Sequence, residues 1–226
     1  MIVYGNPVGK NQTLITKIKS IVVKEIVDES FLRDKALSLI DENDKVLDCG
    51  KSLRDRYSLL VKRGINIDTL DLNVFENYPD IQVDICDSKS MKNLANKYDF
   101  VICFSLIEHC YDPFLASSNL FKSLRRGGKI IGSAPFLFPH HGPEDLSYQD
   151  YFRFTRDSYA LLFPDAYKIT LYPLRGRLGT TLVIFSLKYR FNFEARFPKF
   201  SRWLNQKISK GRNRIQTSGF GFIIEK

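Results

Sequence analysis

Acidic residues and a glycine stand at the ends of short apolar runs in this sequence. The run Val46-Leu47 leads into Asp48-Cys49-Gly50, and the run from Ile65 to Leu70 leads into Asp71. Glycine after a strand lets the backbone approach a ligand closely, and a carboxylate after the next strand can accept both ribose hydroxyls. The spacing between Gly50 and Asp71 therefore predicts a pocket for a nucleoside-containing cofactor.

The three histidines of the chain, His109, His140 and His141, all fall near predicted strand ends. Histidine titrates near neutral pH, so a histidine beside a bound substrate can act as general base toward a hydroxyl group. The alternative is a polar loop without chemistry. Glu144 and Asp145 lie nearby, but the set lacks the fixed spacing of a metal motif. The sequence therefore predicts no metal site.

Apolar periodicity places these residues on alternating strands and helices. Between Leu14 and Ile40 the apolar residues recur at helical spacing, which predicts two helices broken near Asp28-Glu29. A helix is also expected at 53–61, with Gly64 just past its end. The alternation predicts a doubly wound parallel sheet. The other predicted elements are strands at 81–85, 99–105, 129–134, 167–172 and 218–225, and helices at 88–97, 112–124 and 156–163.

Right-handed crossovers put the loops that follow the strands at one edge of such a sheet. We expect them to converge on one crevice. Next to the third of these strand ends, Asp87 competes with Asp84 as the acid that faces the ligand. The five predicted strand ends are Asp48–Ser52, Asp71-Leu72, Asp84-Ile85, Ser105–His109 and Pro135–Gly142.

Composition bounds the class of protein. The 226 residues, 44% hydrophobic and 26% charged, suit one α/β domain with a sizeable core. No apolar run approaches the roughly 20 residues of a membrane span, and residues 1–12 contain no apolar signal core. Four cysteines without CxxC spacing indicate small core residues in a reducing compartment, so we expect a cytoplasmic protein.

The net charge of +9 is concentrated in one segment. Residues 188–214 contain nine Lys or Arg against the single acid Glu194, interspersed with aromatic residues such as Phe193 and Trp203. Three interpretations stay open. The segment is a solvated face, a surface for an anionic or lipid-linked substrate at a membrane, or a site for single-stranded nucleic acid.

Five stretches of the chain resemble, in order, motifs of the class I S-adenosylmethionine (SAM)-dependent methyltransferases, especially small bacterial type 11 members. The match covers about half of the chain. A later stretch, His141-Gly142-Pro143 with 150–155, resembles a subgroup often found with surface-glycan genes. The five stretches are Val46–Gly50, Leu70-Asp71, Val83–Ile85, Tyr98–His109 with Asp112-Pro113, and Leu124–Gly128.

The resemblance implies a fold, a cofactor and residue roles. The fold would be a Rossmann-like, mostly parallel seven-stranded sheet with an antiparallel last strand. SAM would be the cofactor, with its ribose on Asp71, its adenine at Asp84 and Ile85, and its methyl-bearing sulfur near Ser105 and Leu106. The remaining cofactor-binding candidates are Asp48, Cys49, Gly50 and Leu72.

The acceptor side follows from the same resemblance. His141 is the first candidate for the general base and His140 the second. Tyr151 and Arg153 would face the acceptor, although Arg153 is equally suited to a structural ion pair that holds its loop. The family usually has a second glycine where this chain has Ser52. SAM has no phosphate, so one close-approach glycine suffices, and the Ser52 hydroxyl can cap the helix.

We therefore predict a single methyltransferase domain over 1–226, which O-methylates a small or glycan-related acceptor of the surface-polysaccharide type. An RNA methyltransferase that uses the basic segment is one alternative, although Phe104-Ser105-Leu106 differs from the motif of base-amine methyltransferases. A SAM-binding module without catalysis is another, motivated by Ser52. The predicted parts are an N-terminal helical cap (1–43), a SAM-binding core (44–172), a basic aromatic insert (173–216) and a final strand (217–226).

Overall fold

The computed structural model describes residues 21–53, 56–142, 147–188 and 217–226, and positions 197, 200 and 203. Eight strands of this described part form one sheet, in the order β1-β7-β8-β6-β5-β2-β3-β4. The strands are β1 (Ile21–Val23), β2 (Lys45–Cys49), β3 (Asn66–Asp71), β4 (Ile81–Gln82), β5 (Tyr98–Phe104), β6 (Leu124–Pro135), β7 (Lys168–Leu174) and β8 (Gly219–Glu225). The helices are α2 (Glu29–Leu39), α3 (Tyr57–Lys62), α4 (Ser88–Met91), α5 (Pro113–Ser123), α6 (Ser158–Leu162) and α7 (Arg177–Lys188), with short 3-10 turns at Lys92–Leu94 and Ile107–His109.

Strand direction follows the doubly wound pattern. β2 pairs in parallel with β3 and β5, and β5 pairs in parallel with β6. β8 is inserted between β6 and β7 and is antiparallel to both. All strands except β8 therefore run the same way, and the loops after them leave the sheet at the same edge, as the sequence predicts.

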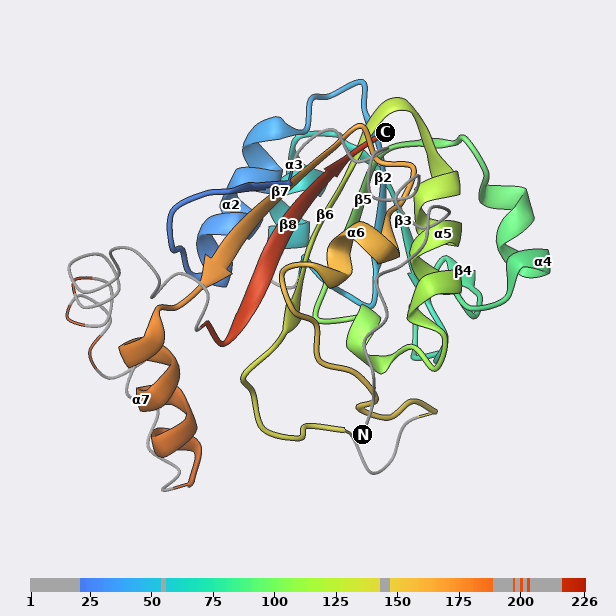
Figure 1. Ribbon diagram of the computed structural model, residues 1–226. Coiled ribbons are helices and arrows are strands. Elements are labelled where there is room, and N and C mark those ends of the chain that lie inside the picture. Colours follow the sequence, from blue (N-terminus) through green and yellow to red (C-terminus); the bar gives the residue numbers. More distant parts are fainter. Residues whose placement is uncertain are drawn as a thin grey trace, which may run out of the picture.

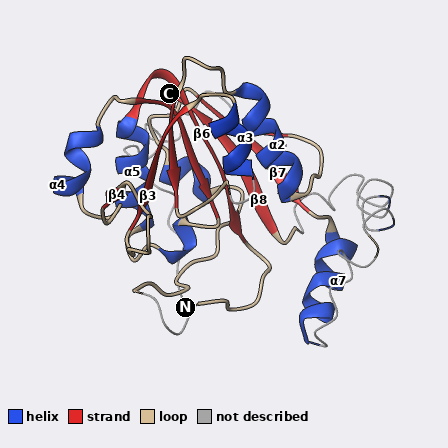
Figure 2. Cartoon of the chain, turned by 180° about the vertical axis from the view of Figure 1, so that it is seen from behind, coloured by secondary structure: helices blue, strands red, loops and turns tan. Residues whose placement is uncertain are grey.

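Helices cover both faces of the sheet (Figures 1 and 2). Alternating side chains of each strand point to opposite faces, so Leu47 joins the core under α5 and α6 while Val46 joins the core under α2 and α3. α7 follows the end of β7 and lies apart from both helical layers (Figure 1). Strands buried on both faces explain the continuous apolar run of β5.

Several helix ends have the residues that such ends require. The Asp28 side chain accepts a hydrogen bond of 2.7 Å from the Phe31 N–H at the start of α2. Asp112 does the same for Leu115 at 2.9 Å, and Pro113 fills the first position of α5. Gly64 follows α3 with φ +72°, a conformation that glycine adopts without strain. These local signals explain why the sequence predicts those helix ends well.

The N-terminal segment corrects the prediction. Residues Ile21–Val23 do not continue a helix but form β1, which pairs in parallel with β7 at the edge of the sheet. The predicted boundary near Asp28-Glu29 is confirmed, because α2 begins at Glu29 with Asp28 as its N-cap. The mostly parallel α/β sheet with an antiparallel last strand is confirmed, but it has eight strands because of β1. The cap at 1–43 is thus only partly helical, and its first 20 residues lie outside the described part.

The C-terminal third holds the remaining predicted elements. The strands expected at 167–172 and 218–225 are β7 and β8, and the helix expected at 156–163 is the shorter α6. The insert expected at 173–216 begins with the end of β7 and with α7, and most of its basic residues lie outside the described part. No helix in the described ranges is long and apolar enough to cross a membrane. All four cysteines are buried with free thiols.

Asp48 is a carboxylic acid buried at the centre of the sheet, with only 1% of its surface exposed. Its two oxygens lie 3.3 and 3.4 Å from the Leu53 N–H, which donates to them weakly. Burial raises the pKa of Asp48 from the usual 3.8 to about 7, against smaller opposing effects of backbone hydrogen bonds and of the Arg33 charge. The folded state therefore holds the Asp48 proton more tightly than the unfolded chain does.

We predict that the free energy of unfolding falls between about pH 4 and 7, because a raised pKa makes ionisation cost stability. Asp48→Asn should flatten this fall, so that above pH 7 the variant is more stable than the wild type. The difference should be about 1.4 kcal/mol for each unit by which the folded state raises the Asp48 pKa. Urea unfolding at several pH values measures the free energy of unfolding of both proteins. Asp165→Asn, at an exposed aspartate, is the control. An equally steep fall in Asp48→Asn would contradict the assignment.

Candidate active site

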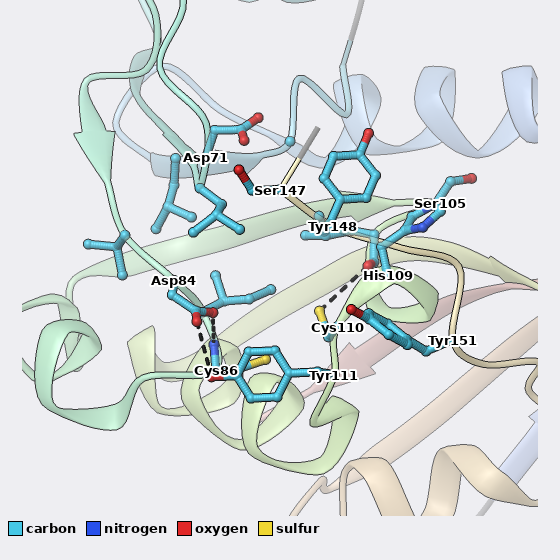
Figure 3. A pocket seen from close by; sticks show the side chains of 16 residues that line it. Asp71, Asp84, Cys86, Ser105, His109, Cys110, Tyr111, Ser147, Tyr148 and Tyr151 are labelled. Carbon is cyan, nitrogen blue, oxygen red and sulfur yellow. Dashed lines mark hydrogen bonds between the residues drawn. The ribbon is translucent and has the colours of Figure 1, made fainter. Parts of the chain in front are cut away.

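The ends of β2, β3, β4 and β5, together with Ser147, Tyr148 and Tyr151, line one pocket of about 400 Å³ (Figure 3). The fifth predicted strand end, Pro135–Gly142, does not contribute to its lining. A volume of this size suits a small-molecule ligand. Asp71 and Asp84 lie on one side of the pocket, and His109, Tyr148 and Tyr151 lie on the other. The pocket residues predicted from the sequence are Gly50, Asp71, Leu72, Asp84, Ile85, Ser105, Leu106 and Tyr151.

Gly50 forms the turn after β2 with φ +67°. Its N–H donates to the Leu70 carbonyl at 2.9 Å, which ties the turn to β3. A Cβ atom at this position would lie 3.1 Å from Leu106 Cδ1, tighter than ordinary packing. Both the backbone angle and the close approach therefore favour glycine. Ser105, after β5, also has a positive φ of +50°, a strained turn of the kind found at functional sites.

Asp71 is held in place at the end of β3. One carboxylate oxygen accepts a hydrogen bond of 2.9 Å from the Asn73 N–H, and the other accepts one of 3.1 Å from the Tyr78 hydroxyl. The Tyr78 oxygen in turn accepts a hydrogen bond of 2.8 Å from the Lys51 N–H. Tyr78 thus connects the Gly50 turn to Asp71, a role that the sequence analysis missed because Tyr78 lies in the irregular loop after β3.

Asp84 and Asp87 have different roles. Asp84 lines the pocket, where its oxygens accept hydrogen bonds from the Cys86 N–H at 2.8 Å and the Tyr111 hydroxyl at 3.1 Å. The bond to Asp84 raises the pKa of Tyr111 to about 12. Asp87 instead caps α4 by accepting from the Lys89 and Ser90 N–H groups. The geometry therefore favours Asp84 as the ligand-facing acid.

Asp48 and Cys49 do not line this pocket. Cys49 is fully buried in the core, where burial raises the pKa of its thiol. Asp48 lies on the other side of the Gly50 turn and lines a separate cavity with Lys51 and Tyr57. Side chains alternate along β2, so Asp48 and Cys49 point to opposite faces of the sheet, and neither points out from the strand end toward the ligand.

Ser52 has a different role from the helix cap that the sequence suggests. Its hydroxyl donates to the Cys49 carbonyl at the end of β2 and accepts from the Phe104 N–H at 2.9 Å, at the end of β5. Its own carbonyl accepts from Arg33 Nε at 3.0 Å. The Ser52 side chain is thus a buried link between two neighbouring strand ends of the pocket.

The histidines separate into two groups. His109 lines the pocket, and its ring packs edge-on against His141 with the centroids 4.9 Å apart. His141 lies behind His109 and 3.8 Å from the fully buried carboxylate of Glu108, measured from Nε2 to Oε1. That carboxylate raises the pKa of His141. His140 is exposed, and neither it nor His141 lines the pocket.

Arg153 forms a structural ion pair with Asp150, which was the alternative to a role in acceptor binding. Its guanidinium binds both oxygens of Asp150 and donates to the carbonyls of Phe138 at 3.2 Å and Pro139 at 3.0 Å. This guanidinium holds the pKa of Asp150 well below its usual range. Arg153 does not line the pocket, and these bonds fasten the loop after β6 to the segment that carries Tyr151.

Sequence reasoning also missed Glu108 and Tyr148. The Tyr148 ring packs against His109 at 5.0 Å between centroids and forms part of the pocket wall. Tyr148 lies in an irregular loop, where no periodicity marks its direction. Glu108 was visible only as part of the Ile107-Glu108-His109 motif, which gives no sign that its carboxylate is fully buried.

Comparisons with known proteins establish the fold. No protein-family model and no curated protein matches this chain. A SAM-dependent methyltransferase from Archaeoglobus fulgidus is 15% identical with a TM-score of 0.52, covering 87% of this chain and 94% of that one. The phosphoethanolamine N-methyltransferase 2 of Haemonchus contortus, solved with S-adenosylhomocysteine, is 15% identical with a TM-score of 0.51, covering 87% of this chain and 52% of that one. The cyclase SpnF is 11% identical with a TM-score of 0.52, covering 94% and 88%.

These likenesses place the chain in the class I methyltransferase fold. At identities of 11–15% they establish the fold alone, and the cyclase among them has the same architecture. The function of this chain must therefore be argued from its own pocket.

We predict that Ser52→Ala lowers the free energy of unfolding by about 1–3 kcal/mol, because it leaves the buried Phe104 N–H without its acceptor. Denaturant unfolding measures the loss. Ser38→Ala is the matched control, since this exposed hydroxyl donates only to the Lys35 carbonyl within its own helix. Equal stability of the Ser52 variant and the wild type would contradict the proposed link between β2 and β5.

Proposed function

We propose that this protein is a SAM-dependent methyltransferase that acts on a hydroxyl group of a small or glycan-related acceptor. The observation that carries the proposal is the meeting of Gly50, Asp71 and Asp84 in one pocket at the carboxyl edge of the sheet. The pocket lies where open α/β sheets bind nucleosides. Its fold neighbours include proteins named as SAM-dependent methyltransferases.

The residues present fit SAM part by part. The Asp71 carboxylate, already oriented by Asn73 and Tyr78, suits two ribose hydroxyls. Asp84 and Ile85 line the same pocket and would face the adenine. Gly50 lines the pocket without a side chain, so a ligand there could approach its backbone closely. A dinucleotide fits less well, because the position of the second glycine of its phosphate-binding turn holds the buried Ser52.

The acceptor would enter beside Tyr151. Tyr151 lines the pocket and remains 49% exposed, so it offers an aromatic face with a hydroxyl group at the pocket mouth, on the side away from Asp84 (Figure 3). Such a side chain suits a ring that carries hydroxyl groups, as in a sugar. The resemblance of residues 141–155 to a subgroup found with surface-glycan genes supports the same acceptor class.

SAM supplies a methyl group on a sulfonium, and this chain supplies the alignment and accepts the proton. Holding a hydroxyl oxygen in line with the methyl group provides much of the rate enhancement in such a transfer. His109 lies in the pocket wall with His141 directly behind it. We assign the acceptor proton to this pair, which is positioned by Glu108 and Asp150.

The basic segment 188–214 lies almost entirely outside the described residues. Nucleic-acid and lipid-linked substrates therefore stay predictions of the sequence, and no described contact favours either over a small acceptor. The four free buried cysteines agree with the cytoplasmic location that we propose.

We predict that SAM binds the wild-type protein in a calorimetric titration and that Asp71→Ala weakens binding at least tenfold. Each lost charge-assisted hydrogen bond to the ribose is worth about 1.5–3 kcal/mol. Asp87→Ala is the matched control, because Asp87 caps α4 outside the pocket. Absence of SAM binding by the wild type would end the proposal, and unchanged binding by Asp71→Ala would remove Asp71 from the site.

We predict acceptor-dependent formation of S-adenosylhomocysteine when the protein is incubated with SAM and a panel of hydroxylated sugars. Tyr151→Ala should raise KM for the acceptor at least tenfold while the SAM affinity changes less than threefold, since we assign Tyr151, which lies across the pocket from Asp71 and Asp84, to the acceptor. The exposed Tyr167→Ala serves as control. Turnover of amine acceptors alone would contradict the hydroxyl assignment.

A further inference from the structure

Three potential metal ligands converge behind the pocket wall: Glu108, His109 and His141. One ligand atom from each lies within 4.8 Å of the other two. The Glu108 Oε1 atom is 3.9 Å from His109 Nε2 and 3.8 Å from His141 Nε2, too far for hydrogen bonds. The cluster joins the turn after β5 to the loop after β6.

Glu108 lacks the partners that a buried carboxylate requires. Its side chain is fully buried, and neither of its oxygens has a hydrogen-bond partner among the described residues. Leaving a charged group buried and unpaired is costly, so such groups are normally paired or bind a metal. This orphaned carboxylate points to a missing cation.

The hydrogen bonds of the two histidine rings determine which nitrogen atoms face Glu108. His109 Nδ1 lies 2.8 Å from the Gln149 carbonyl, to which only an N–H can donate. His141 Nδ1 lies 3.2 Å from both the Pro139 carbonyl and Asp150 Oδ2. In the neutral rings the proton therefore resides on Nδ1, and each Nε2 presents a lone pair toward Glu108. This is the usual arrangement of a metal-bound histidine with an outer hydrogen-bond acceptor.

We propose that Glu108, His109 and His141 bind one divalent transition-metal ion, such as Zn²⁺ or Mn²⁺. Two imidazoles and one carboxylate suit such an ion better than Ca²⁺, which prefers oxygen ligands alone. Bonds of about 2.0–2.2 Å require the three ligand atoms to approach one another by roughly 1 Å. The sequence predicts no metal site because His140 and His141 with Glu144 and Asp145 lack a metal-binding spacing. No sequence pattern links His141 to Glu108 and His109.

The position of this site deepens the proposed function and, in that respect, rests on it. His109 belongs both to the cluster and to the pocket wall, close to Tyr148 and Tyr151 (Figure 3). Three protein ligands leave open positions on a metal ion, as catalytic sites do. Because both Nε2 atoms would bind the ion, the ion would replace the histidine pair as the group that promotes loss of the acceptor proton, and it would orient the acceptor hydroxyl.

The test is a titration of the metal-free protein with Co²⁺, without SAM, followed by visible absorption. The wild type should bind one equivalent with the bands of a coordinated Co²⁺ ion, and Zn²⁺ should displace it. Glu108→Gln, which keeps the shape of the side chain, and His141→Asn should each weaken Co²⁺ binding at least tenfold. His140→Asn is the matched control, because this exposed neighbour lies outside the cluster.

Circular dichroism shows whether each variant is folded. Glu108 lies in the turn after β5 and His141 in the loop after β6, so if one variant fails to fold, the other still tests the proposal. Absence of Co²⁺ bands in the wild type would mean that no metal ion compensates the Glu108 carboxylate, and it would overturn the proposal. Full binding by Glu108→Gln, or loss of binding in His140→Asn, would overturn it as well. SAM binding by the metal-free protein is measured separately by calorimetry. Its result tests the cofactor site, whatever the Co²⁺ titration shows.

Discussion

The Ser52 hydroxyl group is the contact on which the pocket depends most. By bonding the Cys49 carbonyl and the Phe104 N–H, it joins the ends of the neighbouring strands β2 and β5. Arg33 on α2 donates to the Ser52 carbonyl and pairs with Glu29 at 3.2 Å. Glu29 also accepts the hydroxyl groups of Ser105 and Ser133, at the ends of β5 and β6. One polar network, buried at Arg33, Ser52 and Ser133, therefore links the ends of β2, β5 and β6.

Much of the fold could be predicted from the sequence because its signals are local. Gly64 after α3, Asp112-Pro113 before α5 and the apolar run of β5 all mark their elements directly. β1 was missed because Val22 and Ile26 also fit a helical period. The β-branched run Ile21-Val22-Val23 was the competing strand signal, but a strand of three residues is recognised only through its partner β7.

The sequence could predict only those residues of the candidate site that lie at the ends of parallel strands. Topology alone brings Gly50, Asp71 and Asp84 together, and the structure has them in one pocket. What topology leaves open is the direction of each side chain. Asp48 points away from the pocket, Arg153 is committed to Asp150, and Ser52 links strands rather than capping a helix. These outcomes depend on contacts between residues far apart in the chain, which no local pattern encodes.

We propose above all that the ends of β2, β3, β4 and β5 form a SAM site whose ribose anchor is Asp71. The most direct measurement is a crystal structure of the protein with S-adenosylhomocysteine bound. The account predicts the ribose hydroxyls at the Asp71 carboxylate, the adenine beside Asp84 and Ile85, and the amino-acid end at the Gly50 turn. A ligand bound elsewhere, or a ribose that makes no contact with Asp71, would contradict it.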